Sequence, residues 1–226
     1  MMWLLLSPTA LEASFLRGEP FSFLGRKGLR GEGFVWLETG IGKVNAALTL
    51  AAWAGRNPVE KALLFGIAGA YPGSSLLPGD VVLVGEEVEA DLGTQEGLKP
   101  LGFPALEVAG KAYYNRFPLD SSLTRALARV LDLQVVVGLT RDRVSETPGE
   151  AEALASRWGA QVESMEGAAF ARACLALGFP GVEVRAISNP AGVRDKGAWR
   201  IPLAVRALEG TLAPILGGAF PAGLQG

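Results

Sequence analysis

The sequence contains no histidine among its 226 residues. Without an imidazole, the chain cannot form a Ser-His-Asp or Cys-His nucleophilic site, a zinc centre with histidine ligands, or an imidazole acid–base pair. If the protein is an enzyme, carboxylates, amides and backbone dipoles must carry out its chemistry.

Cysteine and long apolar runs are also scarce. The single cysteine, Cys174, excludes disulfides within the chain and thiolate metal clusters, and its apolar neighbours predict a buried side chain rather than a reactive thiol. No apolar run reaches the roughly 18 residues that a membrane span needs, and the first six residues lack the basic segment of a signal peptide. We therefore expect a cytoplasmic protein with no membrane partner, no metal and no cofactor.

Charge is nearly balanced, with 21 basic and 23 acidic residues. A nucleic-acid-binding protein usually has a basic excess or a basic block, and neither is present, so we expect no nucleic-acid partner. Hydrophobic residues make up 49% of the chain, which is typical of a globular protein with a sizeable core.

Short apolar segments alternate with longer Ala/Leu-rich segments along most of the chain. The short ones are rich in Val, Leu and Ile and predict strands buried on both faces, at residues 3–7, 34–38, 62–66, 80–85, 134–139 and 183–187. The longer ones predict helices at residues 10–16, 43–54, 121–131, 148–158, 167–177 and about 198–216. This alternation predicts one α/β domain with a parallel or mixed sheet.

Ligands of such sheets bind beyond the carboxyl ends of the strands, so the residues after each strand are the candidates for a site. Glu12 follows the first strand. It could form a capping box with Thr9, or it could act as a general base. The Gly/Pro-rich segment 93–104 predicts a long surface loop that serves as a lid or a subunit contact.

Two Gly-rich turns follow later strands. The first, Gly40-Ile-Gly-Lys-Val-Asn45, lacks the full dinucleotide or P-loop pattern, and by itself it indicates tight helix packing. The second contains Ile67, Ala68 and Gly69, whose backbone could hold a flat ligand or simply form a turn.

Polar residues stand at two further strand ends. Glu166 begins a helix, where the macrodipole favours its charge with or without a catalytic role. Ser188 and Asn189 end an apolar strand before a Pro/Gly break, and Asn189 needs no function as a turn residue.

Four segments, taken together and in order, resemble the nucleoside phosphorylase/nucleosidase superfamily. They are Gly40-Ile-Gly-Lys-Val-Asn-Ala-Ala, Gly66-Ile-Ala-Gly-Ala, Met165-Glu-Gly-Ala-Ala and Val184-Arg-Ala-Ile-Ser-Asn. The resemblance runs from residue 3 to about residue 205. It implies a single domain over residues 1–226, with three α/β/α layers around a mixed, mostly parallel twisted sheet.

Within the superfamily, the chain looks most like the futalosine hydrolases, the menaquinone-route relatives of the methylthioadenosine/adenosylhomocysteine nucleosidases. The resemblance implies that Glu12 activates the attacking water, that Glu166 holds the ribose hydroxyls, and that Asn189 contacts the base. It also implies substrate contacts by Ile67, Ala68, Gly69, Val144, Met165, Ser188 and Trp199 and, from a neighbouring subunit of a homodimer or larger homo-oligomer, by Phe103. For Trp199 an ordinary place in a helix core is an equal alternative.

The amide at position 189 departs from the adenine-specific nucleosidases, which have Asp there. An amide can donate to a 6-oxo group and accept from a protonated N7, whereas a 6-amino group meets it less well. We therefore expect hypoxanthine rather than adenine as the leaving base. The alternatives are a methylthioadenosine/adenosylhomocysteine nucleosidase, a phosphate-dependent purine nucleoside phosphorylase, and a non-catalytic nucleoside-binding relative. The phosphorylases have a Gly-Asp-Pro segment and an arginine after strand one, and both are missing here.

Overall fold

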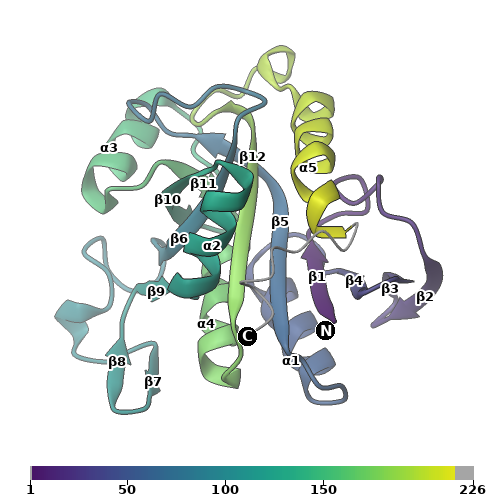
Figure 1. The fold of residues 1–226 in the computed structure, drawn as a ribbon. Coiled ribbons are helices and arrows are strands. Elements are labelled where there is room, and N and C mark those ends of the chain that lie inside the picture. The colour runs from purple at the N-terminus through teal and green to yellow at the C-terminus, as the bar shows by residue number, and fades with distance from the viewer. Residues whose placement is uncertain (1, 217–226) are drawn as a thin grey trace.

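The computed structural model describes residues 2–216 as one α/β domain built on a ten-stranded sheet (Figure 1). The spatial order is β11 (Val162–Ser164), β10 (Gln134–Thr140), β6 (Val81–Glu89), β12 (Gly181–Pro190), β5 (Lys61–Ala70), β1 (Trp3–Ser7), β4 (Phe34–Glu38), β3 (Arg26–Gly31) and β2 (Glu19–Phe23), and β9 (Arg116–Pro118) pairs with β6. The sheet is mixed, since β12 pairs parallel with β5 and antiparallel with β6.

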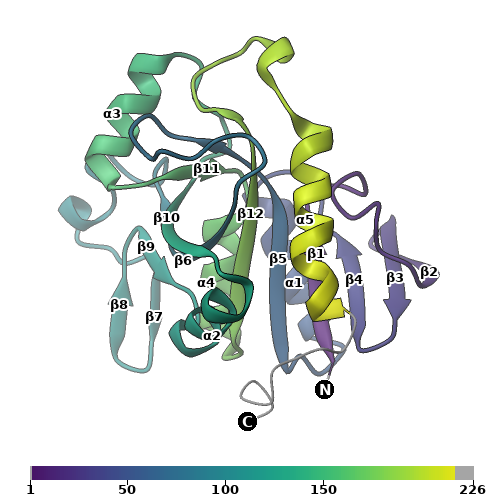
Figure 2. The same cartoon turned by 45° about the horizontal axis from the view of Figure 1, so that its top comes forward.

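Helices cover both faces of the sheet, so the expected three-layer fold is confirmed (Figures 1 and 2). The helices are α1 (Lys43–Ala54), α2 (Ser121–Leu131), α3 (Pro148–Trp158), α4 (Gly167–Leu177) and α5 (Ile201–Leu216). Side chains of α1 and α4 share one core cluster, and side chains of α2 and α5 share the other. Short 3-10 helices at Lys99–Leu101 and Lys196–Ala198 and a small hairpin of β7 (Leu106–Val108) and β8 (Lys111–Tyr113) complete the described chain.

Strand β1 explains why the sequence shows no polar alternation in its central strands. Leu4 and Leu6 pack into the α1/α4 cluster, whereas Trp3 and Leu5 pack into the α2/α5 cluster. Because successive side chains of a strand point to opposite faces, a strand between two helix layers carries apolar side chains on both faces.

Strands β1 and β4 have the expected bounds, and β6 begins one residue later than expected and runs on to Glu89. The other three expected strands lie within longer ones, and four expected helices have the expected bounds. Thr147 caps α3, since its hydroxyl accepts a hydrogen bond from the backbone N–H of Glu150 at 3.2 Å. Cys174 is buried in α4, and burial raises the pKa of its thiol. No helix within residues 2–216 is long and apolar enough to cross a membrane.

The expected helix at residues 10–16 is wrong. This segment is a series of turns with single backbone bonds from Ser14 to Leu11 and from Leu16 to Ala13, because so short a helix is marginal by itself and Glu12 turns its carboxylate into the protein. Strands β2 and β3 were not expected. The ends of the expected domain, residues 1 and 217–226, lie outside the described residues.

Candidate active site

A cavity of about 280 Å³ lies at the carboxyl ends of the central strands. All the expected site residues except Phe103 line it, namely Glu12, Ile67, Ala68, Gly69, Val144, Met165, Glu166, Ser188, Asn189 and Trp199. Phe103 is 76% exposed and lies outside the cavity, in the segment 93–104.

Strand register brings these residues together. Ile187 pairs with Ala68 and Asn189 pairs with Gly69, with a bulge between the two pairs. The bulge leaves Ser188 as an extra residue, and its Oγ lies 3.2 Å from the carbonyl oxygen of Ala68.

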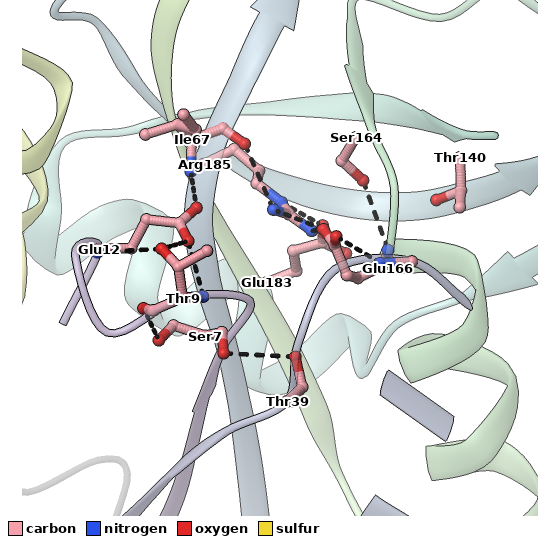
Figure 3. Close-up of polar contacts among 12 residues, drawn as sticks. Ser7, Thr9, Glu12, Thr39, Ile67, Thr140, Ser164, Glu166, Glu183 and Arg185 are labelled. Carbon is pink, nitrogen blue, oxygen red and sulfur yellow. Dashed lines mark hydrogen bonds and ion pairs between the residues drawn. The ribbon is translucent and has the colours of Figure 1, made fainter. Parts of the chain in front are cut away.

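Glu12 is buried, with 4% of its surface exposed, and both of its oxygens accept hydrogen bonds (Figure 3). Oε2 accepts from the backbone N–H of Thr9 at 3.0 Å and from its hydroxyl at 2.6 Å, and Oε1 accepts from the N–H of Ile67 at 3.0 Å. Burial raises the pKa of Glu12, against the opposing effect of these hydrogen bonds. The capping contact with Thr9 therefore forms without a helix, and the same carboxylate lines the cavity.

Glu166 is the N-cap residue of α4, but its side chain makes no capping bond. Its Oε1 accepts from the N–H of Gly42 at 3.0 Å, and its Oε2 lies 3.5 Å from both Nη1 and Nη2 of Arg185. Gly42 has a φ of 92°, which a residue with a side chain rarely adopts, so the glycine of the first turn is needed to aim this N–H.

Arg185 is the main site residue that the sequence reasoning missed. It is 1% exposed, its Nε donates to Glu183 at 2.7 Å, and its Nη1 donates to the carbonyl oxygen of Ile67 at 3.3 Å (Figure 3). Although burial disfavours the cation, Glu183 and Glu166 outweigh it and raise the pKa of Arg185. A charged residue in the middle of an apolar strand was the available signal.

The carboxyl group of Glu87 is also buried and interacts with that of Glu183. Thr140 donates to its Oε2 at 2.7 Å, while Glu87 Oε1 and Glu183 Oε2 are buried without a hydrogen-bond donor among residues 2–216. Burial, followed by the charge of Glu183, raises the pKa of Glu87 well above its usual value. A proton on Glu87 that is shared with Glu183 would satisfy both oxygens.

The amide of Asn189 keeps half of its hydrogen-bonding capacity free. Its Oδ1 accepts from Ser188 Oγ at 2.7 Å, and its Nδ2 donates to the carbonyl oxygen of Pro190 at 2.9 Å. A primary amide has two N–H groups and two lone pairs, so one of each remains for a ligand.

Trp199 and Arg194 form part of the cavity wall. Arg200, the other arginine next to Trp199 in the sequence, does not line the cavity. The Trp199 indole donates to the carbonyl oxygen of Val193 at 3.0 Å, and the guanidinium of Arg194 lies 5.7 Å from its ring centre. The loop 140–147 contributes Val144 and Ser145 to another wall.

The chain matches known sequences over most of its length. The family model of the phosphorylase superfamily matches residues 20–211. A futalosine hydrolase of Thermus thermophilus is 69% identical over 95% of each chain, and one of Streptomyces coelicolor is 35% identical over 82% of this chain and 80% of its own. A 5′-methylthioadenosine/S-adenosylhomocysteine nucleosidase of Geobacillus sp. is 33% identical over 73% of this chain and 71% of its own.

Solved structures share the fold at lower identity. A 5′-methylthioadenosine/S-adenosylhomocysteine nucleosidase of Colwellia psychrerythraea, in complex with adenine, has a TM-score of 0.82 at 23% identity and covers 96% of this chain and 95% of its own. A futalosine hydrolase mutant of Helicobacter pylori has a TM-score of 0.77 at 20% identity, over 94% of this chain and 99% of its own. The chain therefore belongs to the phosphorylase superfamily and groups there with the futalosine hydrolases.

Proposed function

We propose that the protein hydrolyses the N-glycosidic bond of futalosine and releases hypoxanthine and dehypoxanthine futalosine, as a step of menaquinone biosynthesis. The observation that carries this proposal is a pair of buried carboxylates, Glu12 and Glu166, that line one cavity with the neutral amide of Asn189. The high identity to a futalosine hydrolase supports the choice of substrate.

The two carboxylates suit different parts of the reaction. Glu12 takes a proton from water, whose oxygen then bonds to C1′ of the ribose as the C1′–N9 bond breaks and its electron pair leaves with the base. Glu166 accepts hydrogen bonds from the ribose hydroxyls, and its charge stabilises the oxocarbenium-like sugar. The guanidinium of Arg185 pairs with Glu166 at 3.5 Å and holds it in place, and Met165 packs against the ribose.

Asn189 favours hypoxanthine as the leaving base. As the C1′–N9 bond breaks, the leaving base takes a proton from solvent at N7. The free N–H of Asn189 donates to O6, and its free lone pair accepts from the new N7–H. We expect Asn189→Asp to lower kcat/KM for futalosine and to raise it for methylthioadenosine, because a protonated Asp donates to N7 without presenting an amide to the base. Steady-state kinetics on both nucleosides check this; an unchanged preference would contradict the role of Asn189.

Water rather than phosphate is the proposed nucleophile. In the turn after β1, the hydroxyl of Ser7 donates to Thr9, and both donors of Thr9 are bound to Glu12. Arg17 is exposed, and its guanidinium donates to carbonyl oxygens of its own loop, Ser14 and Leu16. These groups are therefore already engaged and do not form a phosphate cradle.

One experiment tests the proposal against its alternatives. The protein is incubated with futalosine, inosine and methylthioadenosine, with and without phosphate, and the released base is identified by chromatography. We expect hypoxanthine from futalosine without phosphate. Strict phosphate dependence would indicate a phosphorylase, preferential release of adenine a methylthioadenosine nucleosidase, and binding without turnover a non-catalytic relative.

The proposal includes a tail contact, a homo-oligomer and a cytoplasmic location. Arg194 lines the cavity and Arg200 does not, so Arg194 is the cation proposed to pair with the benzoate of the futalosine tail. Exposed Phe103 is proposed to contact the site of a neighbouring subunit. Fractionation of the native cells checks the location.

A further inference from the structure

Glu163 is a cavity-lining carboxylate for which the proposed mechanism has no role. It is 7% exposed and lies on β11, in register with Gly69 of β5. Asn189 of β12 is also in register with Gly69, on its other side. Directly paired residues of neighbouring strands point to the same face of a sheet, so Glu163 and Asn189 face the cavity on either side of Gly69.

The glycine makes room between these two side chains. A Cβ at position 69 would lie 3.1 Å from Cγ of Glu163 and 3.3 Å from its Oε1. These distances are shorter than most contacts of real Cβ atoms, so the absent side chain lets Oε1 lie beside the backbone of Gly69. Gly69 is also the residue that pairs with Asn189, whose amide is proposed to contact the base.

The two oxygens of Glu163 have different surroundings. Oε2 accepts hydrogen bonds from the Ser145 hydroxyl at 2.6 Å, the Ser145 N–H at 3.2 Å and the Tyr71 hydroxyl at 3.2 Å. Oε1 accepts none from residues 2–216, and Glu163 lines the cavity. Three donors thus fix the orientation of the carboxylate and leave one acceptor for a ligand.

We propose that Glu163 Oε1 accepts a hydrogen bond from N1–H of the purine and so makes the site specific for 6-oxopurine nucleosides. The inference rests on the proposed function and extends it. Hypoxanthine carries a hydrogen on N1, next to the O6 that Asn189 contacts. Adenine instead presents an N1 lone pair, which the carboxylate repels. Glu163 and Asn189 therefore contact N1–H and O6, which are neighbouring groups on the same edge of the base.

The substitution Glu163→Gln tests this proposal, because it should shift the base preference of the site from hypoxanthine toward adenine. The three donors at Oε2 hold the amide oxygen of Gln in that position, so its NH₂ group faces the base. An NH₂ group opposes N1–H of hypoxanthine but donates to N1 of adenine. We expect the ratio of kcat/KM for futalosine to that for methylthioadenosine to fall by about 10²-fold or more, because a mismatched buried polar contact discriminates strongly.

Binding of the free bases gives a readout that does not depend on turnover. Calorimetry with hypoxanthine and adenine is expected to show tighter binding of hypoxanthine to the wild type and a shift toward adenine in Glu163→Gln. Glu152→Gln is the matched control, because Glu152 is an exposed carboxylate on α3 outside the cavity, and neither ratio should change. Thermal unfolding checks that each variant is folded.

A second variant covers the case in which Glu163→Gln does not fold. Glu163→Asp keeps the charge but withdraws the acceptor by one methylene, so we expect hypoxanthine preference to weaken without a gain for adenine. If the wild type hydrolyses futalosine and the folded variants keep its base preference, the inference is wrong and the proposed function stands. If the wild type does not hydrolyse futalosine, the proposed function fails, and the binding ratios still decide the role of Glu163.

Discussion

At the scale of single residues, the burial of Glu12 sets the pH range in which this carboxylate can act as a base. Burial raises its pKa, so the ionised form becomes dominant only at a pH above the usual range of a glutamate. We therefore expect kcat/KM to fall as the pH drops through this raised pKa. A pH profile of kcat/KM checks this expectation. With no histidine in the chain, an ionisation near neutral pH must come from a shifted carboxylate or from the substrate.

Glu12→Gln tests the same residue directly. We expect kcat to fall by about 10²- to 10⁴-fold, the usual contribution of a general base, while substrate binding is largely retained. Single-turnover kinetics and ligand titration separate the two effects. Full activity in this variant would leave Glu12 with only its contacts to Thr9 and Ile67.

The buried Glu87 predicts a pH dependence of stability rather than of activity. Its raised pKa means that, between the unfolded and folded values, the native state binds a proton that the unfolded state has lost. The free energy of unfolding therefore falls as the pH rises through this window, by up to about 1.4 kcal/mol per pH unit. Glu87→Gln carries no titrating proton, so we expect it to flatten the curve and to be more stable than the wild type at alkaline pH.

Urea denaturation of the wild type and of Glu87→Gln at several pH values checks this expectation. The exposed Glu152→Gln is again the control, and its curve should follow the wild type. Parallel curves for Glu87→Gln and the wild type would show that Glu87 is ionised in the native protein.

At the scale of elements, strand β5 contains a glycine that the site requires for space. A Cβ at Gly66 would lie 2.7 Å from Oε1 of Glu12 and 2.9 Å from Nη1 of Arg185. We expect Gly66→Ala to fold but to lower kcat/KM by at least about 10-fold, because displacement of either group disturbs the site geometry. Gly149→Ala on α3, where a Cβ meets nothing within 4 Å, is the control that should retain full activity.

Helix boundaries followed from the sequence where local chemistry sets them. The α3 start at Thr147 and its end at Gly159, which has a φ of 66°, are properties of the chain itself. The central strands were recognisable because both of their faces are apolar. The hairpin of β2 and β3 was missed because all of its residues except Gly28 are exposed or only half-buried, and Phe21 and Phe23 of β2 give too short an apolar alternation to stand out.

The site residues also differ in whether they could be predicted from the sequence. Glu12, Glu166 and Asn189 follow strands directly, so fold class and resemblance together were enough to propose them. Arg185 and Glu163 acquire their proposed roles only through contacts with residues distant in the sequence, with Glu166 in one case and with Gly69 in the other. Strand register across the sheet cannot be read from one sequence, so these residues could not be assigned from it.

At the scale of the whole molecule, an apolar surface adjoins the site. Ile41, Val44 and Leu48 are exposed in and just before α1, and Ile41 also lines the cavity. We propose this surface as the contact between copies of the chain, and we expect Val44→Asp to dissociate the oligomer because Val44, on α1, is 77% exposed. Light scattering coupled to size exclusion measures the mass.

Val130→Asp is the control for that experiment, since Val130 is exposed on α2 at the opposite face of the sheet. It should leave the mass unchanged. A monomeric wild type would contradict the proposed assembly. Dissociation with an increase in KM would agree with a site that a second subunit completes.

The position of β12 has a consequence for how the protein is made. Strands β5 and β6 follow one another in the chain, yet β12 lies between them and carries Arg185, Ser188 and Asn189. A ribosome must therefore synthesise residues 181–190 before either strand meets its central partner, and until then their edges stay open. The centre of the sheet can therefore form only after β12 has been synthesised, and a chain that ends before β12 lacks Arg185, Ser188 and Asn189 of the site.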